Sequence, residues 1–372
     1  MSMLLNHKAK PRTDSGTVRA AVGAVQDPEL HRGLAELGML RDVDVDRRGR
    51  ARIEIALTTS ACPLRESLRE AISTAATDAG ATSVEVGFST MSERDRTELA
   101  GNIRGERPRG LDERTRVYAV ASGKGGVGKS SVTANLAVAL ARSGQRVGVL
   151  DADVWGYSIP HLFGVRRNPI ALNGIMLPVE AHGVRLMSVG LFVDDAEPVV
   201  WRGPMLHKAL EQFLVDVHWD DLDVLLLDLP PGTGDVALSL LELVPQAALL
   251  AVTTPQPAAQ NVAARVGRMA RDQRMPIAGV VENMSALVCG SCGTATQMFG
   301  SGGGHRLAEQ LDVPLLAQVP LDIAMREAGD AGIPVVARDP DAPSAVVMAT
   351  LAAELPVVRR GLAGVPLPLS VV

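Results

Sequence analysis

The chain has 372 residues, of which 47% are hydrophobic and 21% charged, and its formal net charge at pH 7 is −5. This length predicts two domains, and the apolar fraction is typical of a globular protein with a sizeable core. The acidic net charge argues against a nucleic-acid-binding protein, and three cysteines do not make a secreted disulfide framework. The chain has no apolar run near the 20 residues that a membrane span needs. We therefore expect a soluble cytoplasmic protein with no nucleic-acid or membrane partner.

The first part of the chain is expected to form a polar, mobile leader over residues 1–13 and a small α+β domain over residues 14–91. Asp14 or Ser15 can cap the first helix, and Pro63 suits the first position of the second helix. The expected elements, in chain order, are a helix over 14–25, a strand over 52–57, a helix over 63–79 and a strand over 83–88.

Residues 92–116 are rich in charge and nearly free of core-forming side chains, so we interpret them as a linker, part of which can be helical. Beyond it, short apolar runs alternate with helical segments. The runs expected as strands are 117–121, 147–151, 184–189, 224–228, 248–253, 277–281 and 315–318. Continuous apolar strands are typical of a sheet covered by helices on both faces. The sequence therefore predicts an α/β domain over 117–372 with a doubly wound, mostly parallel sheet.

A phosphate-binding motif, GxxxxGK[ST], lies between the first of these strands and a helix expected to reach about Arg142. Its residues are Gly123, Lys124, Gly125, Gly126, Val127, Gly128, Lys129 and Ser130. Backbone N–H groups of such a loop turn toward one anion, and the helix N-terminus adds a partial positive charge. We expect the loop, together with Ser131, to bind ATP, with Lys129 at the β- and γ-phosphates and the Ser130 hydroxyl on Mg²⁺.

A second lysine, Lys124, stands near the start of the motif. In this respect the loop resembles the deviant Walker A class, which includes nitrogenase iron protein, the Min and Par ATPases and the Mrp/ApbC group. The resemblance implies a homodimer in which Lys124 reaches the partner's phosphates and acts as an arginine finger does. The alternative is an exposed loop lysine.

Acidic residues end two of the expected strands: Asp151 and Asp153 follow one, and Asp228 ends another. Ligands of open α/β sheets bind at the carboxyl ends of strands, so we expect these groups near the phosphates. Asp228 is expected to hold Mg²⁺, with Asp151 close to the metal and Asp153 orienting the attacking water. Residues 228–235 are interpreted as a switch loop, although Asp235 could equally be a turn carboxylate.

Cys289 and Cys292 form a CxxC pair in a loop rich in glycine, serine and threonine. Thiolates bind zinc, copper(I) or iron–sulfur clusters, and a complete site needs about four ligands. A homodimer would bring two pairs together and supply them. A shared structural zinc and two unmodified loop cysteines remain alternatives. Cys62 is either a reactive thiol at a helix start or a small core residue.

Taken together, these motifs resemble the Mrp/ApbC iron–sulfur cluster carrier proteins over most of residues 117–340. The matching runs are SGKGGVGKS (122–130), LDADVWGYSIP (150–160), WRGPM (201–205), DLPPGTGD (228–235), VVENMS (280–285) and FGSGGG (299–304), with the cysteine pair between the last two. The runs DPEL (27–30), LGM (37–39) and TSACPL (59–64) resemble the small domain that precedes the ATPase in many bacterial members.

The resemblance implies an ATP-hydrolysing homodimer that holds a labile [4Fe–4S] cluster between two CxxC pairs and transfers it to apoproteins. It also implies that Asn283 lies near the adenine. The chain departs from the family pattern at Trp155 and Tyr157, where Tyr and Pro are usual, so we expect altered packing there without loss of the carboxylates.

Two other functions fit parts of the sequence. A Min- or Par-like positioning ATPase would need a C-terminal basic amphipathic helix or a basic face, whereas Pro366 and Pro368 oppose a terminal helix. An ATPase with a structural zinc at the cysteine pair would differ from a carrier in its metal content.

Overall fold

The structure of the protein is a computed structural model. It describes residues 14–59, 64–105, 110–153, 156–192, 203–234, 237, 240, 242–289 and 292–357. The chain divides into two compact units, one of Met1–Arg109 with Ile170–Leu177 and one of Gly110–Pro169 with Pro178–Val372. The leader, the expected helix start at Pro63 and the prolines Pro366 and Pro368 lie outside the described residues.

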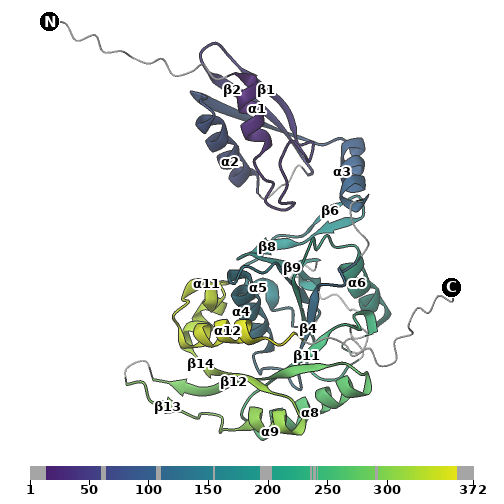
Figure 1. Ribbon diagram of the computed structural model, residues 1–372, viewed down its shortest axis with the longest axis vertical. Helices are drawn as coiled ribbons and strands as arrows, with labels where there is room; N and C mark the ends of the chain where they lie inside the picture. Colours follow the sequence, from purple (N-terminus) through teal and green to yellow (C-terminus); the bar gives the residue numbers. More distant parts are fainter. Residues whose placement is uncertain are drawn as a thin grey trace, which may run out of the picture. The chain divides into compact units, whose positions relative to one another are not determined.

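The first unit contains a three-stranded sheet in the order β1-β2-β3, with two helices packed on it (Figure 1). Its elements are α1 (Ser15–Gly23), β1 (Leu40–Val45), β2 (Arg50–Leu57), α2 (Arg65–Asp78) and β3 (Ser83–Thr90). The helix cap is confirmed, because the Asp14 carboxylate accepts the N–H of Thr17 at 2.7 Å. Both predicted strands are confirmed, whereas β1 was not predicted. Its charged residues face solvent and only Val43 is fully buried, so its sequence carries little apolar signal.

The segment expected as a charged linker forms a helix, α3 (Glu93–Gly105), whose Leu99 and Ile103 are buried. They share one core with a hairpin of the same unit, β6 (Ile170–Leu172) and β7 (Ile175–Leu177). The Asn173 amide in the hairpin turn donates to Thr97 Oγ1 at 2.7 Å. The apolar partner of α3 comes from residues some 70 positions later in the chain. The local sequence of this segment therefore gives no sign that it packs into a core.

The second unit is built on a nine-stranded sheet in the order β13-β12-β11-β4-β10-β5-β9-β8, with β14 also paired to β12 (Figure 1). All its pairings are parallel except those of the edge strands β8 and β13. The strands are β4 (Arg116–Ser122), β5 (Val147–Asp151), β8 (Val179–Ala181), β9 (Val184–Ser188), β10 (Val224–Asp228), β11 (Ala248–Thr253), β12 (Ile277–Val288), β13 (Ala295–Thr296) and β14 (Leu315–Leu321).

Helices cover both faces of this sheet. They are α4 (Lys129–Arg142), α5 (Ile159–Leu162), α6 (Gly203–Val215), α8 (Pro257–Asp272), α9 (Gly303–Gln310), α10 (Ile323–Asp330), α11 (Val335–Arg338) and α12 (Pro343–Glu354), with a 3-10 helix over Val189–Phe192. Alternate residues of β11 belong to different cores: Leu250 and Val252 pack with α4 and α12, and Ala251 packs with α8 and α9. The doubly wound, mostly parallel sheet is thereby confirmed.

All seven strands predicted for this unit are present, and the longest difference is in β12, which continues seven residues past the expected end at Val281. Polar Glu282 and Asn283 interrupt its apolar run although both are buried. None of the helices among the described residues is long and apolar enough to cross a membrane.

Candidate nucleotide-binding site

The glycine-rich motif forms the turn between β4 and α4, and its backbone lies against two neighbouring segments. Gly126 and Gly128 have φ values of 79° and 77°, which L-residues with side chains rarely adopt. A Cβ on Gly128 would lie 2.2 Å from Asn283 Nδ2, and one on Gly123 would lie 2.3 Å from the backbone nitrogen of Ala263. The motif therefore needs glycine at 126 for its turn, at 123 for its close packing, and at 128 for both.

Asp228 is the centre of the polar contacts at this loop. It ends β10, the strand between β4 and β5, and is fully buried. Its Oδ2 lies 2.7 Å from Lys129 Nζ and 2.6 Å from Ser130 Oγ, and its Oδ1 lies 2.7 Å from Thr133 Oγ1. The ion pair with Lys129 compensates the buried charge of Asp228. The structure thus brings together the predicted residues Lys129, Ser130 and Asp228.

The same group of oxygens fits a magnesium ion. Mg²⁺ prefers hard oxygen ligands and keeps several waters, and the Ser130 hydroxyl and the Asp228 carboxylate are both at the phosphate-binding loop. Asp151 is paired in register with Asp228 on the neighbouring strand and is also buried. These residues would hold the ion, which would neutralise charge on the phosphate oxygens.

Asp151 has an unusual environment for a carboxylate. Its Oδ2 accepts the Ser188 hydroxyl at 3.1 Å and its Oδ1 accepts the N–H of Asp153 at 3.1 Å. Burial and, next, the negative charge of Asp228 raise the pKa of Asp151 to about 8, against the smaller effects of these hydrogen bonds and of Lys129. Below this pKa the Asp151 carboxyl keeps its proton when Mg²⁺ is absent, so a bound Mg²⁺ would have to displace that proton.

This raised pKa predicts a pH-dependent stability of the magnesium-free protein. The unfolded chain loses the Asp151 proton near pH 3.9, whereas the folded chain keeps it up to about pH 8. Between these values the folded state binds one proton more, so the free energy of unfolding falls as pH rises from about 4 to about 8. Chemical denaturation across this range checks the slope. It should flatten in Asp151→Asn and not in Asp272→Asn, which changes an exposed residue at the end of α8.

Thr133 is a functional residue that the sequence reasoning missed. It lies one turn after Lys129 on α4, is fully buried, and its hydroxyl is 3.0 Å from the Lys129 carbonyl oxygen as well as 2.7 Å from Asp228. The spacing of four residues from the motif lysine is the signal that could have found it. Ser188, at the carboxyl end of β9 beside Asp151, was also missed, because a single hydroxyl belongs to no sequence motif.

Thr133→Val should lower the free energy of unfolding by about 1–3 kcal/mol, because one oxygen of the buried Asp228 loses its hydrogen-bond partner. Urea denaturation at neutral pH measures the change. Thr350→Val is the matched control, since Thr350 makes the same kind of bond to a carbonyl four residues back at 3.0 Å but is exposed on α12. Equal losses in both variants would show that the Asp228 contact adds nothing.

Three other predicted site residues, Lys124, Asn283 and Asp153, make hydrogen bonds within the chain itself. Lys124 Nζ lies 3.1 Å from Gln256 Oε1 of its own chain. The Asn283 amide donates to the Val127 carbonyl at 2.9 Å, which places it against the phosphate loop. Asp153 Oδ1 accepts the N–H of Gly156 at 3.1 Å. The nucleotide-binding and catalytic roles of these residues stay predictions, and Asp235 and Trp155 lie outside the described residues.

The cysteine pair lies apart from this loop, in the connection between β12 and β13. Cys289 and Cys292 are both exposed and unoxidised. The loop is tied by the Cys289 N–H to the Thr294 carbonyl at 3.0 Å, and Cys292 Sγ lies 3.2 Å from Thr294 Oγ1. Hydrogen bonds from Thr294 lower the pKa of Cys292, which favours the thiolate that binds metals. Cys62 lies outside the described residues.

The sheet, the loop between β4 and α4 and the buried aspartate that ends β10 define a P-loop nucleotide-binding protein. Residues 113–356 match the family described as the NUBPL iron-transfer P-loop NTPases, and residues 16–88 match the iron–sulfur cluster assembly protein family. The chain belongs to the iron-transfer P-loop NTPases.

Relatives named iron–sulfur cluster carrier proteins match this chain over nearly their whole length. It is 49% identical over 369 residues to the iron–sulfur cluster carrier protein of Mycobacterium tuberculosis, covering 96% of this chain and 97% of the relative. It is 42% identical over 338 residues to that of Deinococcus radiodurans, covering 90% and 93%. The resemblance stated from the motifs is confirmed, and it favours the carriers over the Min- and Par-like ATPases.

Among solved structures, the fold is similar to that of the nucleotide-binding protein in complex with ADP from Archaeoglobus fulgidus. The TM-score is 0.56 and the identity 32%, and the match covers 73% of this chain and 99% of the other. This likeness confirms the P-loop NTPase fold.

Proposed function

We propose that the protein is an ATP-hydrolysing carrier that assembles a labile [4Fe–4S] cluster at a homodimer interface and transfers it to apoproteins in the cytoplasm, where thiols stay reduced. The observation that carries the proposal is an exposed pair of unoxidised cysteines on an iron-transfer P-loop NTPase. The cluster is the cargo, and ATP with Mg²⁺ is the substrate of the hydrolytic site.

A second copy of the chain is needed to complete the cluster site. Iron–sulfur clusters of this type take four thiolates, and this loop supplies two. Among the residues that the structure describes, no group of three or more His, Cys, Asp or Glu side chains could hold a metal ion. A two-fold axis beside the loop would bring two exposed pairs together and give the required number.

Hydrolysis is proposed to use the residues already placed around Asp228. Water attacks the γ-phosphorus, the bond to the β–γ bridging oxygen breaks, a proton of the water passes to the phosphate product, and ADP and phosphate leave. Asp153 orients the water and Lys129 stabilises charge on the β- and γ-phosphates. Lys124 would contribute from the partner copy once it leaves Gln256, and Asn283 would bind the nucleotide beside the loop.

Anaerobic reconstitution with iron and sulfide tests the proposal. We expect about four iron and four sulfide per dimer, a dimer by light scattering, and recovery of activity in an apo-enzyme that needs a [4Fe–4S] cluster. Reconstituted protein that holds only zinc, or holds a cluster that no apoprotein receives, would contradict the carrier function and leave a P-loop ATPase.

A further inference from the structure

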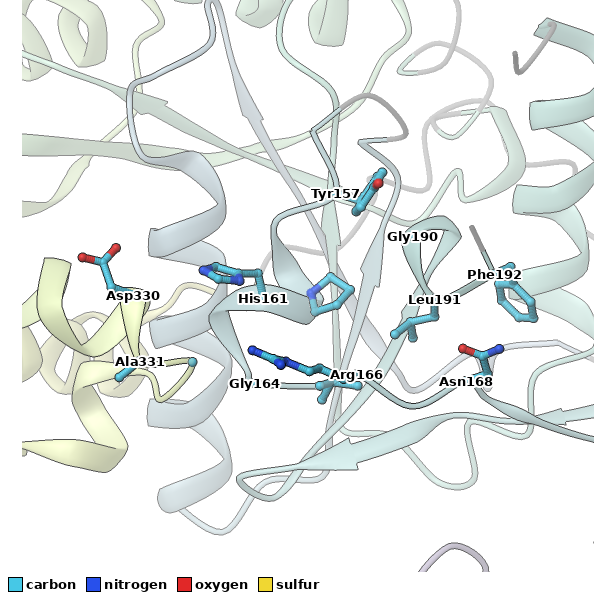
Figure 2. A pocket seen from close by; sticks show the side chains of 13 residues that line it. Tyr157, His161, Gly164, Arg166, Asn168, Gly190, Leu191, Phe192, Asp330 and Ala331 are labelled. Carbon is cyan, nitrogen blue, oxygen red and sulfur yellow. The ribbon is translucent and has the colours of Figure 1, made fainter. Parts of the chain in front are cut away.

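A cavity of about 860 Å³ lies in the second unit, away from the phosphate loop (Figure 2). It is formed by α5 and the loop that follows it, by the 3-10 helix over Val189–Phe192, and by the turn that ends α10. Its volume falls in the range of pockets that bind ligands, about 300–1,000 Å³. None of the residues assigned to ATP, Mg²⁺ or the cluster lines it.

The uncompensated charge of this cavity is positive. Arg166 makes no hydrogen bond or ion pair with any residue that the structure describes. The acidic group at the rim, Asp330, is already paired with Arg326 at 2.8 Å. Figure 2 shows the side chains of His161 and Arg166 on the same side of the cavity. An unpaired guanidinium beside an imidazole favours a carboxylate ligand, which it can bind with two parallel hydrogen bonds.

Part of the cavity lining, beside Asn168, is apolar. Figure 2 shows Leu191 and Phe192 there, and Phe192 is 47% exposed although it stacks on Phe213 with ring centroids 5.7 Å apart. Exposed aromatic surface next to a cationic group suits a ligand that carries both a carboxylate and an apolar side chain. A short acidic peptide segment has this combination.

One wall of the cavity is connected to the nucleotide site by hydrogen bonds. The N–H of Gly190, which lines the cavity, donates to Ser188 Oγ at 3.0 Å, and the same hydroxyl donates to Asp151 at 3.1 Å. The ring of Tyr157 packs on Gly190 so closely that a Cβ there would lie 2.5 Å from it. Ser188 therefore connects Asp151 to the wall of the cavity by two hydrogen bonds.

We propose that this cavity binds an acidic segment of a partner polypeptide, with Arg166 holding a carboxylate and Phe192 an apolar side chain, and that its affinity depends on the nucleotide through Ser188. The nucleotide dependence rests on the proposed function, whereas the peptide site does not.

Fluorescence anisotropy with a labelled peptide, Leu-Asp-Phe-Glu, tests the binding. We expect saturable binding that weakens about tenfold or more in Arg166→Gln, since a charge-assisted bond of this kind contributes that much. Arg268→Gln, which removes an exposed arginine of α8, should bind as the wild type does. No binding, or equal binding of the amide peptide Leu-Asn-Phe-Gln when both peptides have an amidated C-terminus, would overturn the proposal. Competition by free glutarate as strong as by the peptide would assign the cavity to a small acid instead.

Two further measurements separate this proposal from the others. Peptide affinity should differ by about fivefold or more between the nucleotide-free and the Mg·ATP-bound protein, and Ser188→Ala should narrow the difference. Equal affinities in both states would overturn the nucleotide dependence. Cys292→Ser protein should bind the peptide normally, so a failed carrier function and a failed peptide site give different results.

Discussion

Replacing Lys129 with alanine should reduce kcat for ATP hydrolysis by about 10²–10³-fold, the loss typical when one preorganised group that stabilises developing charge is removed. Lys129 is the first residue of α4, and its Nζ lies 2.7 Å from Asp228, so the ammonium is already held at the phosphate loop. Because this ion pair is nearly fully buried, the alanine variant also leaves an uncompensated carboxylate and should be less stable by several kcal/mol, about 3–5.

A second variant separates lost chemistry from lost stability. Lys129→Arg keeps the positive charge beside Asp228, so its denaturation midpoint should stay near that of the wild type, but its bulkier head group should still impair hydrolysis. Lys208→Ala, at an exposed lysine of α6, is the control and should hydrolyse ATP normally. Steady-state phosphate release and urea denaturation of the same preparations give both quantities. Wild-type rates in both Lys129 variants would exclude this lysine from the mechanism.

Cys292→Ser should abolish cluster binding, lowering iron and sulfide from about four of each per dimer to near zero. The dimer would keep two of its four thiolates, and a serine hydroxyl does not replace a soft sulfur ligand. The Cys292 thiol is exposed and tied to Thr294 at 3.2 Å, so its loss should not disturb the fold. Iron, sulfide and zinc analysis after anaerobic reconstitution measures the effect.

Cys62→Ser is the matched control, because it removes the third cysteine of the chain and leaves the CxxC pair. It should reconstitute as the wild type does. ATP hydrolysis without cluster should be similar in all three proteins, since the cysteine loop lies apart from the residues around Asp228. A cluster of full stoichiometry in Cys292→Ser would place the ligands elsewhere in the chain.

The phosphate loop and the strands of the second unit could be predicted from sequence because each depends on a continuous stretch. The motif at 123–130 specifies its own turn, and β10 reads as a buried strand because residues 224–227 form a continuous apolar run. The first unit was less predictable. The strand β1 alternates charge with a few apolar residues, and the core partner of α3 is a hairpin that the chain supplies much later.

Within the site, the predicted carboxylates could be found because they follow apolar strands, whereas two of the hydroxyl groups that contact them were missed. Thr133 and Ser188 contribute one hydroxyl each, and their roles depend on strand order and register that place them beside Asp228 and Asp151. Arg166 gave no signal either. What distinguishes it is its place in the lining of the cavity beside His161, and that is a property of the folded chain.

The hairpin of β6 and β7 has a practical consequence for dissecting this protein. Since Ile170–Leu177 belongs to the first unit, the chain crosses between the units three times, and no single cut separates them. A fragment that begins at Gly110 would retain Leu172, Ile175 and Leu177 while losing the side chains of α3 that cover them. Such an uncovered apolar hairpin promotes aggregation. An isolated ATPase unit should therefore be made with a short polar turn joining Pro169 to Pro178.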